Sequence, residues 1–594
     1  MNLVWLVWWS QLRWPIEGPI TLTGSYGEIR GINFHTGIDI SVGERIGEVP
    51  VLAAADGYVY RLRVSHTGFG KVVYVRHPHG LVTVYGHLSH FAPQGEQIVE
   101  SLQKQQRRFE VEKFLSEGEW SVKAGDTIGW AGNSGYSFGP HLHFEVRTSQ
   151  DKPLLPLRYL PTLQDTEPPV FFRVGLRPLS IGAHVEGRGE NVFLRLKQKQ
   201  RGATYRQYEC PDTIRVGGRV GVVYTAGDRA GGGRAWLGLR RLALYDSEGK
   251  LLYQAEWETL DFDWRRFLRW HVDFAYQQVY RIGIARAYES NDLLPWSKGK
   301  GWIEVPPNQV RCFLLQAEDY AGNWTQVRFY LRSEPPPSQL LHRPLDPRAL
   351  WSIEEGLLLS REVLVTRAGD TIAPHKPLAL KGKLIDSLYA LNGRAYPTFL
   401  KACCAPGLDY TLALGRNCTL HLYRETLQET LYLRVEPIRT PWGEGFLIGD
   451  PFIPLRFPAQ LWWEVPSSMS VEKSYPLYRL WDGGQWSPVS GAVRRGKVWR
   501  IPVRTWGAYI LGEDTFPPRI RPLRGKGLYY LIAIEDLGSG VDPYALRVTS
   551  ENGIVYPEYY EPQRLLYLPR SKGRHFVIEA SDRVGNRTRR EIHY

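Results

Sequence analysis

Residues Pro140-His-Leu-His-Phe-Glu-Val-Arg147 decide the fold of the first quarter of this 594-residue chain. Apolar and polar side chains alternate along the stretch, which predicts a β-strand. In such a strand His141 and His143 point to the same face, about 6.6 Å apart. We place Glu145 on the opposite face, where it would make a structural salt bridge. A strand that presents two imidazoles to one side predicts one wall of a metal site.

A second pattern, His35-Thr-Gly-Ile-Asp39, lies upstream. In a straight strand the two polar ends would lie about 13 Å apart, too far for one ion. Gly37 is therefore the predicted bend that lets His35 and Asp39 converge. A helix would also bring these positions together, but the glycine and isoleucine before Asp39 disfavour it. Catalytic zinc sites use three such donors and leave one position open.

Further candidates lie around these patterns. Eight of the 15 histidines fall in the first 150 residues, so any histidine chemistry belongs there. Tyr85-Gly-His87 follows a predicted strand and offers another imidazole, and Tyr85 would share the face of His87. The glycine-rich segment 129–139 leads into His141, which indicates backbone lying close to another group. We predict that Tyr85, His77 and Asn133 line or support a substrate groove.

Six motifs in order carry a resemblance: Tyr26-Gly-Glu-Ile-Arg30, Phe34-His-Thr-Gly-Ile-Asp-Ile40, Ala55-Asp-Gly57, Tyr85-Gly-His-Leu88, Ala124-Gly-Asp-Thr-Ile-Gly129 and Gly139-Pro-His-Leu-His-Phe-Glu145. This ordered set resembles the lysostaphin-type (LytM-like) zinc endopeptidases of bacterial cell walls. The resemblance covers roughly residues 14–147, about a quarter of the chain. No His-Glu dipeptide occurs in the sequence, so the HExxH helix of thermolysin-type enzymes is absent.

The resemblance implies residue roles. His35, Asp39 and His143 would bind one Zn²⁺ per chain, and His87 and His141 would be the catalytic histidines. We favour His141 as the general base and His87 as the group that stabilises the oxyanion.

The implied function is that of an enzyme, a zinc metalloendopeptidase that hydrolyses peptide bonds in the stem or cross-bridge peptides of peptidoglycan. A catalytically silent relative that binds the wall or activates another hydrolase is the alternative, although such relatives lose ligands and all five positions are intact here. A third hypothesis is a surface-adhesive β protein whose enzyme domain is incidental. The substrate implies an exported, periplasmic or envelope-associated protein.

The net charge and the N-terminal apolar run bear on the expected partners and location of the protein. Lys and Arg exceed Asp and Glu by 74 to 61, which favours anionic polymers without choosing among them. Besides peptidoglycan we expect envelope proteins as partners of the C-terminal modules, and no nucleic acid. The apolar run 3–9 is far shorter than the roughly 20 residues of a transmembrane helix, so we expect no such segment. It resembles a weak or truncated signal peptide.

At about 150 residues per domain the chain should divide into roughly four units, mainly β in fold class. We predict a possible signal remnant (1–13), a LytM-like β-sheet peptidase domain (14–160) with a helical insertion at about 94–122, and three β-sandwich, immunoglobulin-like regions. These are an enlarged module (165–332), one or more middle modules (333–513) and a C-terminal module (514–594).

A partial repeat supports this division. Asp165-Thr-Glu-Pro-Pro recurs as Asp514-Thr-Phe-Pro-Pro, and Ala317-Glu-Asp-Tyr-Ala-Gly-Asn-Trp-Thr recurs as Ala580-Ser-Asp-Arg-Val-Gly-Asn-Arg-Thr. Paired prolines are typical of a linker, and Asp-x-x-Gly-Asn predicts a turn before a final strand. The first copy is much the longer, so it is either one enlarged sandwich or two.

Overall fold

The computed structural model describes residues 12–30, 33–78, 80–180, 182–230, 233, 235–273, 283–288, 294–336, 350–354, 357–373, 378–449, 455–479, 486–525 and 528–594. The fold is mainly β, as predicted. Of the predicted signal remnant 1–13, all but Leu12 and Arg13 lie outside the described residues. Within the described part, no helix has the length and apolar character needed to cross a membrane.

The N-terminal domain (residues 12–160) is built on one antiparallel sheet of 11 strands whose central strands run in the order β4, β12, β8, β7, β6. A separate hairpin, β2 and β3, follows the first strand. The strands are β1 (Leu22–Gly24), β2 (Ile29–Arg30), β3 (Asn33–Phe34), β4 (Ile38–Ser41), β5 (Pro50–Leu52), β6 (Gly57–Val64), β7 (Lys71–Arg76), β8 (Val82–Phe91), β9 (Val111–Phe114), β10 (Ser121–Val122), β11 (Thr127–Ala131), β12 (His141–Arg147) and β13 (Pro153–Leu154), and a short 3-10 helix η1 (Pro156–Arg158) ends the domain.

The insertion predicted as helical over 94–122 is only half helix. Helix α1 (Pro93–Gln106) begins at a proline, whose fixed φ suits the first turn, and ends at Arg107 in the left-handed region. The following residues return to the sheet, because β9 and β10 both pair with β6. Long polar side chains occur both before and after Arg107, so composition does not separate the helix from the strands that follow it.

The first module (residues 165–336) is one sandwich with a single main hydrophobic core, which decides between the two alternatives left by its length. A four-stranded sheet faces an eight-stranded sheet. Its elements are β14 (Val170–Pro178), β15 (His184–Val185), β16 (Val192–Phe193), β17 (Lys197–Arg201), β18 (Tyr205–Gly217), β19 (Val220–Gly227), β20 (Arg241–Asp246), β21 (Leu251–Glu256), η2 (Phe262–Phe267), α2 (Leu268–His271), β22 (Ala285–Arg286), β23 (Ser297–Lys298), β24 (Val310–Glu318) and β25 (Trp324–Ser333).

The middle of the chain contains two cores. A small β unit (residues 350–398) has its own apolar cluster, and the middle module (residues 399–513) is a sandwich of a six-stranded and a five-stranded sheet. The strands are β26 (Trp351–Glu354), β27 (Leu357–Ser360), β28 (Leu364–Thr366), β29 (Thr371–Ile372), β30 (Leu378–Ala379), β31 (Ser387–Ala390), β32 (Ala395–Pro397), β33 (Leu400–Cys404), β34 (Tyr410–Ala413), β35 (Cys418–Leu422), β36 (Leu431–Thr440), β37 (Gly443–Ile448), β38 (Ala459–Glu464), β39 (Ser474–Arg479), β40 (Ser487–Pro488), β41 (Val493–Arg495), β42 (Val498–Val503) and β43 (Gly507–Glu513).

The last module (residues 514–594) packs two four-stranded sheets around a compact core. The strands are β44 (Arg519–Pro522), β45 (Tyr529–Glu535), β46 (Arg547–Ser550), β47 (Gly553–Val555), β48 (Glu558–Tyr560), β49 (Leu565–Pro569), β50 (His575–Ser581) and β51 (Arg587–His593), with a 3-10 helix η3 (Arg570–Lys572).

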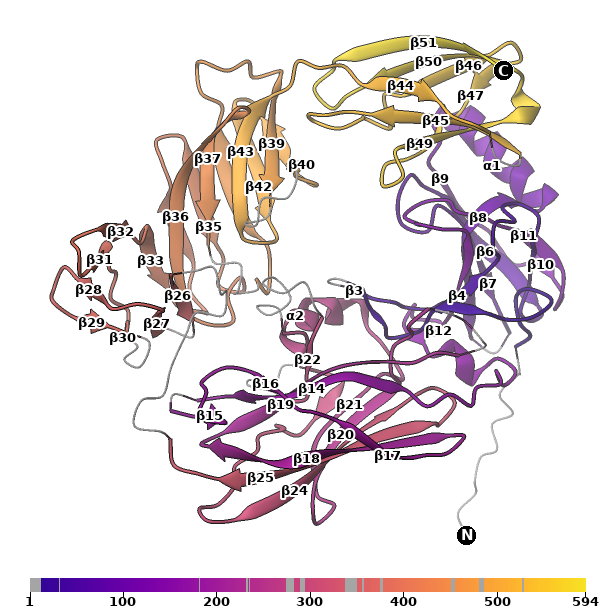
Figure 1. Cartoon of the computed structure of the whole chain (residues 1–594). Coiled ribbons are helices and arrows are strands. Elements are labelled where there is room, and N and C mark those ends of the chain that lie inside the picture. The colour runs from indigo at the N-terminus through magenta and orange to yellow at the C-terminus, as the bar shows by residue number, and fades with distance from the viewer. Residues whose placement is uncertain are drawn as a thin grey trace.

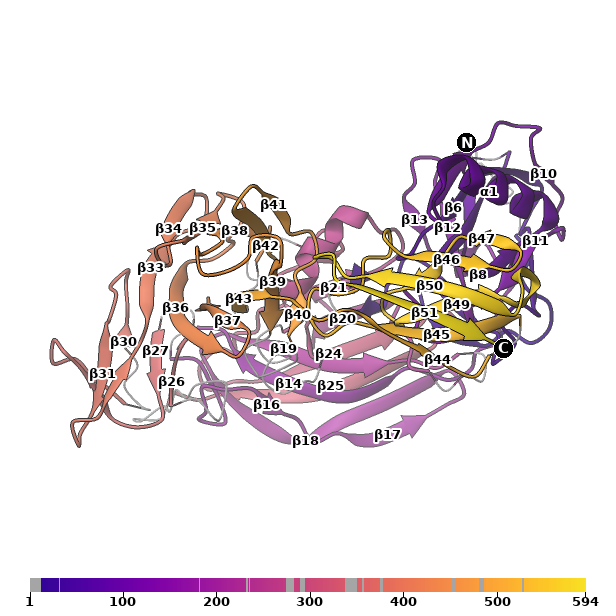
Figure 2. The same cartoon turned by 90° about the horizontal axis from the view of Figure 1, so that it is seen from above.

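The chain curves back on itself, so that the last module lies against the N-terminal domain (Figure 1). The view from above places the same two units side by side (Figure 2). A buried ion pair joins them, with Lys71 Nζ 2.8 Å from a carboxylate oxygen of Glu558. Tyr529 adds a hydrogen bond from its hydroxyl to the carbonyl oxygen of Ser89, at 3.0 Å. The two ends of the sequence therefore form one packed interface.

Candidate functional site

Strand pairing brings the predicted residues together at the centre of the N-terminal sheet. Strand β12 lies between β4 and β8, with His143 opposite Asp39 on one side and opposite Gly86 on the other. Directly opposed residues in antiparallel strands share a face. Asp39 and His143 therefore point to the same side of the sheet, away from the apolar face that carries Phe144.

His35, Asp39 and His143, called here the His-Asp cluster, converge on one point. His35 Nε2 lies 3.0 Å from Asp39 Oδ1 and 3.0 Å from His143 Nδ1, and His143 Nδ1 lies 2.9 Å from Asp39 Oδ1. Gly37 makes this possible, because the chain bends there and passes close to β12. A side-chain carbon at Gly37 would lie 2.3 Å from the carbonyl oxygen of Phe144.

Each imidazole of the cluster has its other nitrogen bound. His35 Nδ1 donates to the carbonyl oxygen of Ser25 at 2.8 Å, and His143 Nε2 donates to Glu145 Oε1 at 2.8 Å. These acceptors assign the ring protons to the outer nitrogens. The lone pairs of His35 Nε2 and His143 Nδ1 then face each other and the Asp39 carboxylate.

Glu145 corrects the sequence prediction, which placed it on the opposite face. Residues two and four apart in a strand share a face, so Glu145 lies beside His143 and orients its ring. Glu145 is fully buried and also accepts a hydrogen bond from Arg147 Nε at 2.5 Å. Although burial alone would raise it, the Arg147 charge and the His143 contact lower the pKa of Glu145 to about 2.

The charges of the cluster depend on one another. Burial opposes ionisation of Asp39, yet the charge of His35 and the close imidazoles of His141 and His143 hold the pKa of that carboxyl well below its usual range. Burial also lowers the pKa of His35. Burial would lower that of His143 too, but its hydrogen bonds to Asp39 and Glu145 raise the pKa to about 9.

His141 and His87 flank the cluster, with ring centroids 4.8 Å apart. His141 Nδ1 donates to the carbonyl oxygen of Gly139 at 2.8 Å, and its buried Nε2, 3.3 Å from Asp39 Oδ1, makes no hydrogen bond with the described residues. His87 Nδ1 donates to the carbonyl oxygen of Ser134 at 2.7 Å. Burial and the neighbouring histidines lower the pKa of His87 well below its usual value, so the ring is neutral.

A bulge in β8 turns His87 towards the cluster. His87 has φ of 61°, and the pairing of β8 with β7 shifts register between Lys71 and Val73. Bulges redirect side chains at functional sites and strain the backbone of a non-glycine residue. Without the bulge, His87 would point with Tyr85 into the apolar face.

Tyr85 consequently does not line a groove, contrary to the prediction. Its side chain is fully buried in the core, packs against Phe144 and accepts a hydrogen bond from the backbone N–H of Ala54 at 2.8 Å. His77 belongs to the same buried network, since its Nε2 lies 2.8 Å from Thr83 Oγ1, and Thr83 donates to the Tyr85 hydroxyl. Both residues support the sheet from the side away from the cluster.

Asn133 lies near the site, in the loop 132–140 that joins β11 to β12. Its Oδ1 accepts a hydrogen bond from Ser137 Oγ at 2.7 Å, and the next residue, Ser134, holds His87. Tyr136 and Phe138 on this loop are exposed and contact each other edge to face. The loop thus positions one histidine and offers an aromatic surface beside it.

Sequence reasoning gave no role to two residues that contact the cluster. Arg30 Nη2 lies 2.8 Å from Asp39 Oδ2, which directs the other oxygen of Asp39 towards the histidines. Phe69 stacks on the ring of His143 with centroids 4.8 Å apart. Arg30 ends the first of the six motifs, so its position was visible in the sequence; Phe69 lies outside every motif and left no signal.

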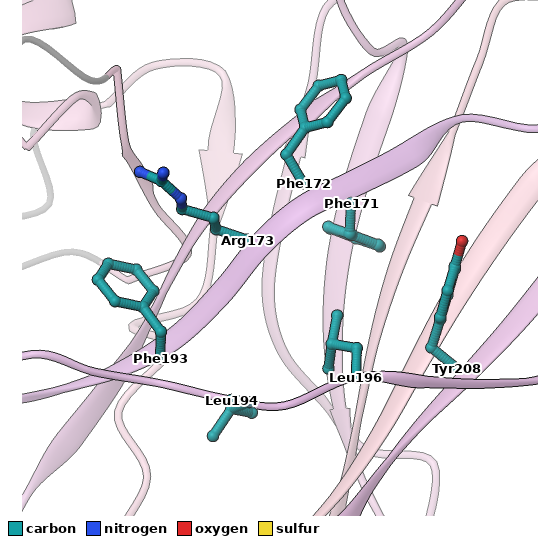
Figure 3. A pocket seen from close by; sticks show the side chains of 7 residues that line it. All are labelled: Phe171, Phe172, Arg173, Phe193, Leu194, Leu196 and Tyr208. Carbon is teal, nitrogen blue, oxygen red and sulfur yellow. The ribbon is translucent and has the colours of Figure 1, made fainter.

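Two surface hollows among the described residues lie elsewhere. One, in the first module, is lined by apolar side chains and one arginine (Figure 3): Phe171, Phe172, Arg173, Phe193, Leu194, Leu196 and Tyr208. The other lies between the N-terminal domain and the first module, around Trp257 and His271. Neither contains a predicted site residue.

The donor set of the His-Asp cluster fits a zinc ion. Two imidazole nitrogens and a carboxylate oxygen converge within 3.0 Å of one another, and each histidine has a hydrogen-bonded outer nitrogen, as metal ligands do. The lone pairs of His35 and His143 repel each other unless a proton or a cation lies between them. A proton on His143 or a bound zinc ion would each relieve this repulsion.

Comparison with known proteins agrees with this geometry. Residues 33–104 match the model of Peptidase family M23. The N-terminal domain is a peptidase family M23 domain. A DD-carboxypeptidase/endopeptidase, Mpg, of Neisseria meningitidis is 34% identical over 134 residues, which are 22% of this chain and 24% of that protein. The murein hydrolase activator NlpD of Escherichia coli is 30% identical over 152 residues, 26% of this chain and 32% of that protein.

Solved structures are also similar to part of the chain. The catalytic domain of the prophage-encoded M23 protein EnpA of Enterococcus faecalis is 29% identical, covers 22% of this chain and 83% of its own, and has a TM-score of 0.17. The catalytic domain of lysostaphin from Staphylococcus simulans is 26% identical, covers 23% and 87%, and has a TM-score of 0.17. The chain spans about a quarter to a third of the length of the curated relatives above.

Proposed function

We propose that the M23 domain is a zinc-dependent endopeptidase that cleaves peptide bonds in the stem or cross-bridge peptides of peptidoglycan. The observation that carries the proposal is that three imidazole nitrogens, from His35, His141 and His143, lie within 3.3 Å of Asp39 Oδ1, and that the ring of His87 lies beside that of His141. Relatives named as a DD-carboxypeptidase/endopeptidase and as a murein hydrolase activator support peptidoglycan as the polymer. That polymer implies an exported, envelope-associated protein.

In this proposal His35, Asp39 and His143 hold one zinc ion. When bound, zinc polarises a peptide carbonyl and makes water more acidic. Arg30 and Glu145 fix Asp39 and His143 in place, and the buried stacking of Phe69 on His143 keeps bulk water off that side. The ligand geometry is therefore set before substrate arrives.

His141 is the proposed general base. Its Nδ1 proton is committed to the Gly139 carbonyl, so Nε2 has a free lone pair facing the cluster. Asp39, 3.3 Å away, stabilises the ring once it has taken a proton from water.

His87 is the proposed oxyanion stabiliser, and its environment sets a condition for that role. Its Nδ1 proton is committed to Ser134, so Nε2 can donate a hydrogen bond only when the ring carries two protons. Negative charge developing on the substrate oxygen favours that form, whereas the resting ring is neutral.

The test is mass spectrometry of muropeptides released from purified peptidoglycan by the full chain. We expect new amino and carboxyl ends that disappear with a chelator and fall by a factor of about 100 or more with His141→Ala. His593→Ala, an exposed histidine on the last module, is the matched control and should leave cleavage unchanged.

Zinc content separates the competing functions. The wild-type chain should hold one zinc, His141→Ala should keep it, and Asp39→Asn should lose it. Zinc binding without cleavage by wild type would contradict the enzymatic proposal and favour the activator function suggested by the name of the Escherichia coli relative. Absence of zinc would contradict the ligand assignment.

A further inference from the structure

The repeated motifs of the first and last modules form the same clasp. In the first module Asn323 Nδ2 donates to the carbonyl oxygen of Asp165 at 3.2 Å and to Asp319 Oδ2 at 2.9 Å. In the last module Asn586 Nδ2 makes the equivalent bonds to Asp514 at 3.0 Å and Asp582 Oδ2 at 2.7 Å. The clasp ties the linker that enters each module to the turn before its final strand.

Each clasp brings two aspartates next to a third that lies outside the sequence repeat. Asp228 follows β19 and Asp536 follows β45, and in each module that strand pairs with the strand that leaves the linker. One carboxylate oxygen each of Asp165, Asp228 and Asp319 lies within 4.8 Å of the others. The same holds for Asp514, Asp536 and Asp582.

The first cluster is buried and incompletely bonded. Asp228 is 3% exposed and Asp319 fully buried. Backbone N–H groups and Asn323 satisfy oxygens of Asp319, and the N–H of Glu167 bonds Asp165, but Oδ1 of Asp228 has no hydrogen-bond partner among the described residues. No lysine, arginine or histidine of the described part of the chain forms an ion pair with the three carboxyls.

The second cluster has the same arrangement, but its third aspartate, Asp536, is only half-buried. Asp514 and Asp582 are buried, and Oδ1 of Asp536 again has no hydrogen-bond partner among the described residues. Among the described residues, no lysine, arginine or histidine forms an ion pair with the carboxyls of either cluster, so no cationic side chain balances their negative charge.

We propose that each cluster is a calcium site, with Asp165, Asp228 and Asp319 as ligands in the first module and Asp514, Asp536 and Asp582 in the last. Carboxylate-only donors favour a hard cation, and Ca²⁺ lies about 2.3 to 2.6 Å from its oxygens. Ca²⁺ also tolerates irregular coordination by about six to eight oxygens, whereas Mg²⁺ demands near-ideal octahedral geometry.

Calcium at these positions stiffens the junctions between modules. Asp165 lies in the segment that joins the N-terminal domain to the first module, and Asp514 joins the middle module to the last. The residue after Asp319, Tyr320, donates its hydroxyl to the carbonyl oxygen of Tyr26 in the M23 domain. A cation that fixes the Asp319 turn therefore also fixes a contact next to Ser25, the residue that holds His35.

Equilibrium dialysis with radioactive calcium tests the proposal on the full chain, stripped of metal and with zinc restored at one equivalent. Wild type should bind two Ca²⁺, with dissociation constants of about 10⁻⁴ to 10⁻³ M, as for extracellular modules. Asp228→Asn and Asp536→Asn should each bind one, and the double variant none. Asp212→Asn, an exposed aspartate of the first module, is the matched control and should bind two.

Thermal unfolding distinguishes a variant that has lost calcium binding from one that does not fold. Without calcium, Asp228→Asn should melt no lower than wild type, because it removes a buried charge. With calcium, wild type should gain the most stability, each single variant should gain less, and the double variant should gain none. Failure of wild type to bind calcium at millimolar concentration, binding that the double variant retains, or equal displacement by Mg²⁺ would each overturn the assignment.

Discussion

The first and last modules contain the same kind of clasp, but they contact different parts of the M23 domain. One contacts the segment that holds His35, and the other contacts the loop that holds His87. The first module reaches the segment that holds His35: the backbone N–H of Gly238 donates to Ser25 Oγ at 2.7 Å. The last module reaches the loop that holds His87: Gln563 Nε2 donates to the carbonyl oxygens of Asn133 at 2.8 Å and Ser137 at 3.0 Å.

This difference indicates that the positions shared by the two motifs form the clasp within each module. The positions that differ between the motifs determine which part of the molecule each module contacts. Tyr320 and Arg583 occupy equivalent places in the two turns, yet Tyr320 bonds Tyr26 of the M23 domain and Arg583 bonds Glu561 of its own module. A repeat in sequence therefore predicts a shared fold, and the side chains between its fixed positions determine the interface.

The largest expected effect comes from a substitution in the interface between the last module and the M23 domain. Glu558→Ala leaves the buried ammonium of Lys71 without its partner, which should weaken docking by about 3 to 5 kcal/mol. Hydrogen exchange of the backbone amides in β7 and β48 measures this loss, and the first module should keep its protection.

The matched control for that prediction is Glu100→Ala. Its ion pair with Lys572 crosses the same interface, but both side chains are nearly half exposed. Exposed pairs contribute about 0 to 1 kcal/mol. Equal effects of the two variants would show that burial of the Lys71 pair does not matter.

The second prediction compares the two contacts that support His87 and His35. Gln563→Ala removes both hydrogen bonds to the loop 132–140, worth about 1 kcal/mol each, so kcat on a soluble muropeptide should fall roughly 5- to 30-fold. Tyr320→Phe removes one bond behind His35 and should lower kcat less than 5-fold. Gln150→Ala, an exposed residue, should change nothing. A larger loss with Tyr320→Phe would reverse the ranking of the two contacts.

The smallest effect is a pH dependence confined to the last interface. His66 Nδ1 donates to the carbonyl oxygen of Tyr559 at 2.7 Å, and burial lowers the pKa of His66 below 6.5. The undocked ring therefore binds a proton more readily, so docking should weaken as the pH falls below about 6.5, by at most 1.4 kcal/mol per pH unit. Hydrogen exchange of β48 between pH 7 and 5 measures it, and His66→Gln should remove the dependence.

Sequence patterns predicted the two halves of the His-Asp cluster because each half is local, whereas the pairing of β4 with β12 brings the halves together. His141 and His143 alternate in one strand, and the bend at Gly37 follows from the spacing of His35 and Asp39. Tyr85 was misplaced for the converse reason. The bulge at His87, where φ is positive, breaks the alternation of side chains between the two faces of β8. The residue types in Tyr85-Gly-His87 do not predict that φ angle.

By itself, the sequence determined a mainly β chain, an M23-like set of donors and a repeated linker and turn. Only the tertiary structure decided that Asp228 and Asp536 complete two carboxyl clusters and that the last module packs beside the loop 132–140. The physical reason is range. Alternation and turn residues act over a few positions. By contrast, Asp165 and Asp228 lie 63 positions apart, and Asn133 and Gln563 lie 430 positions apart. Only the packing of complete sheets brings such residues together.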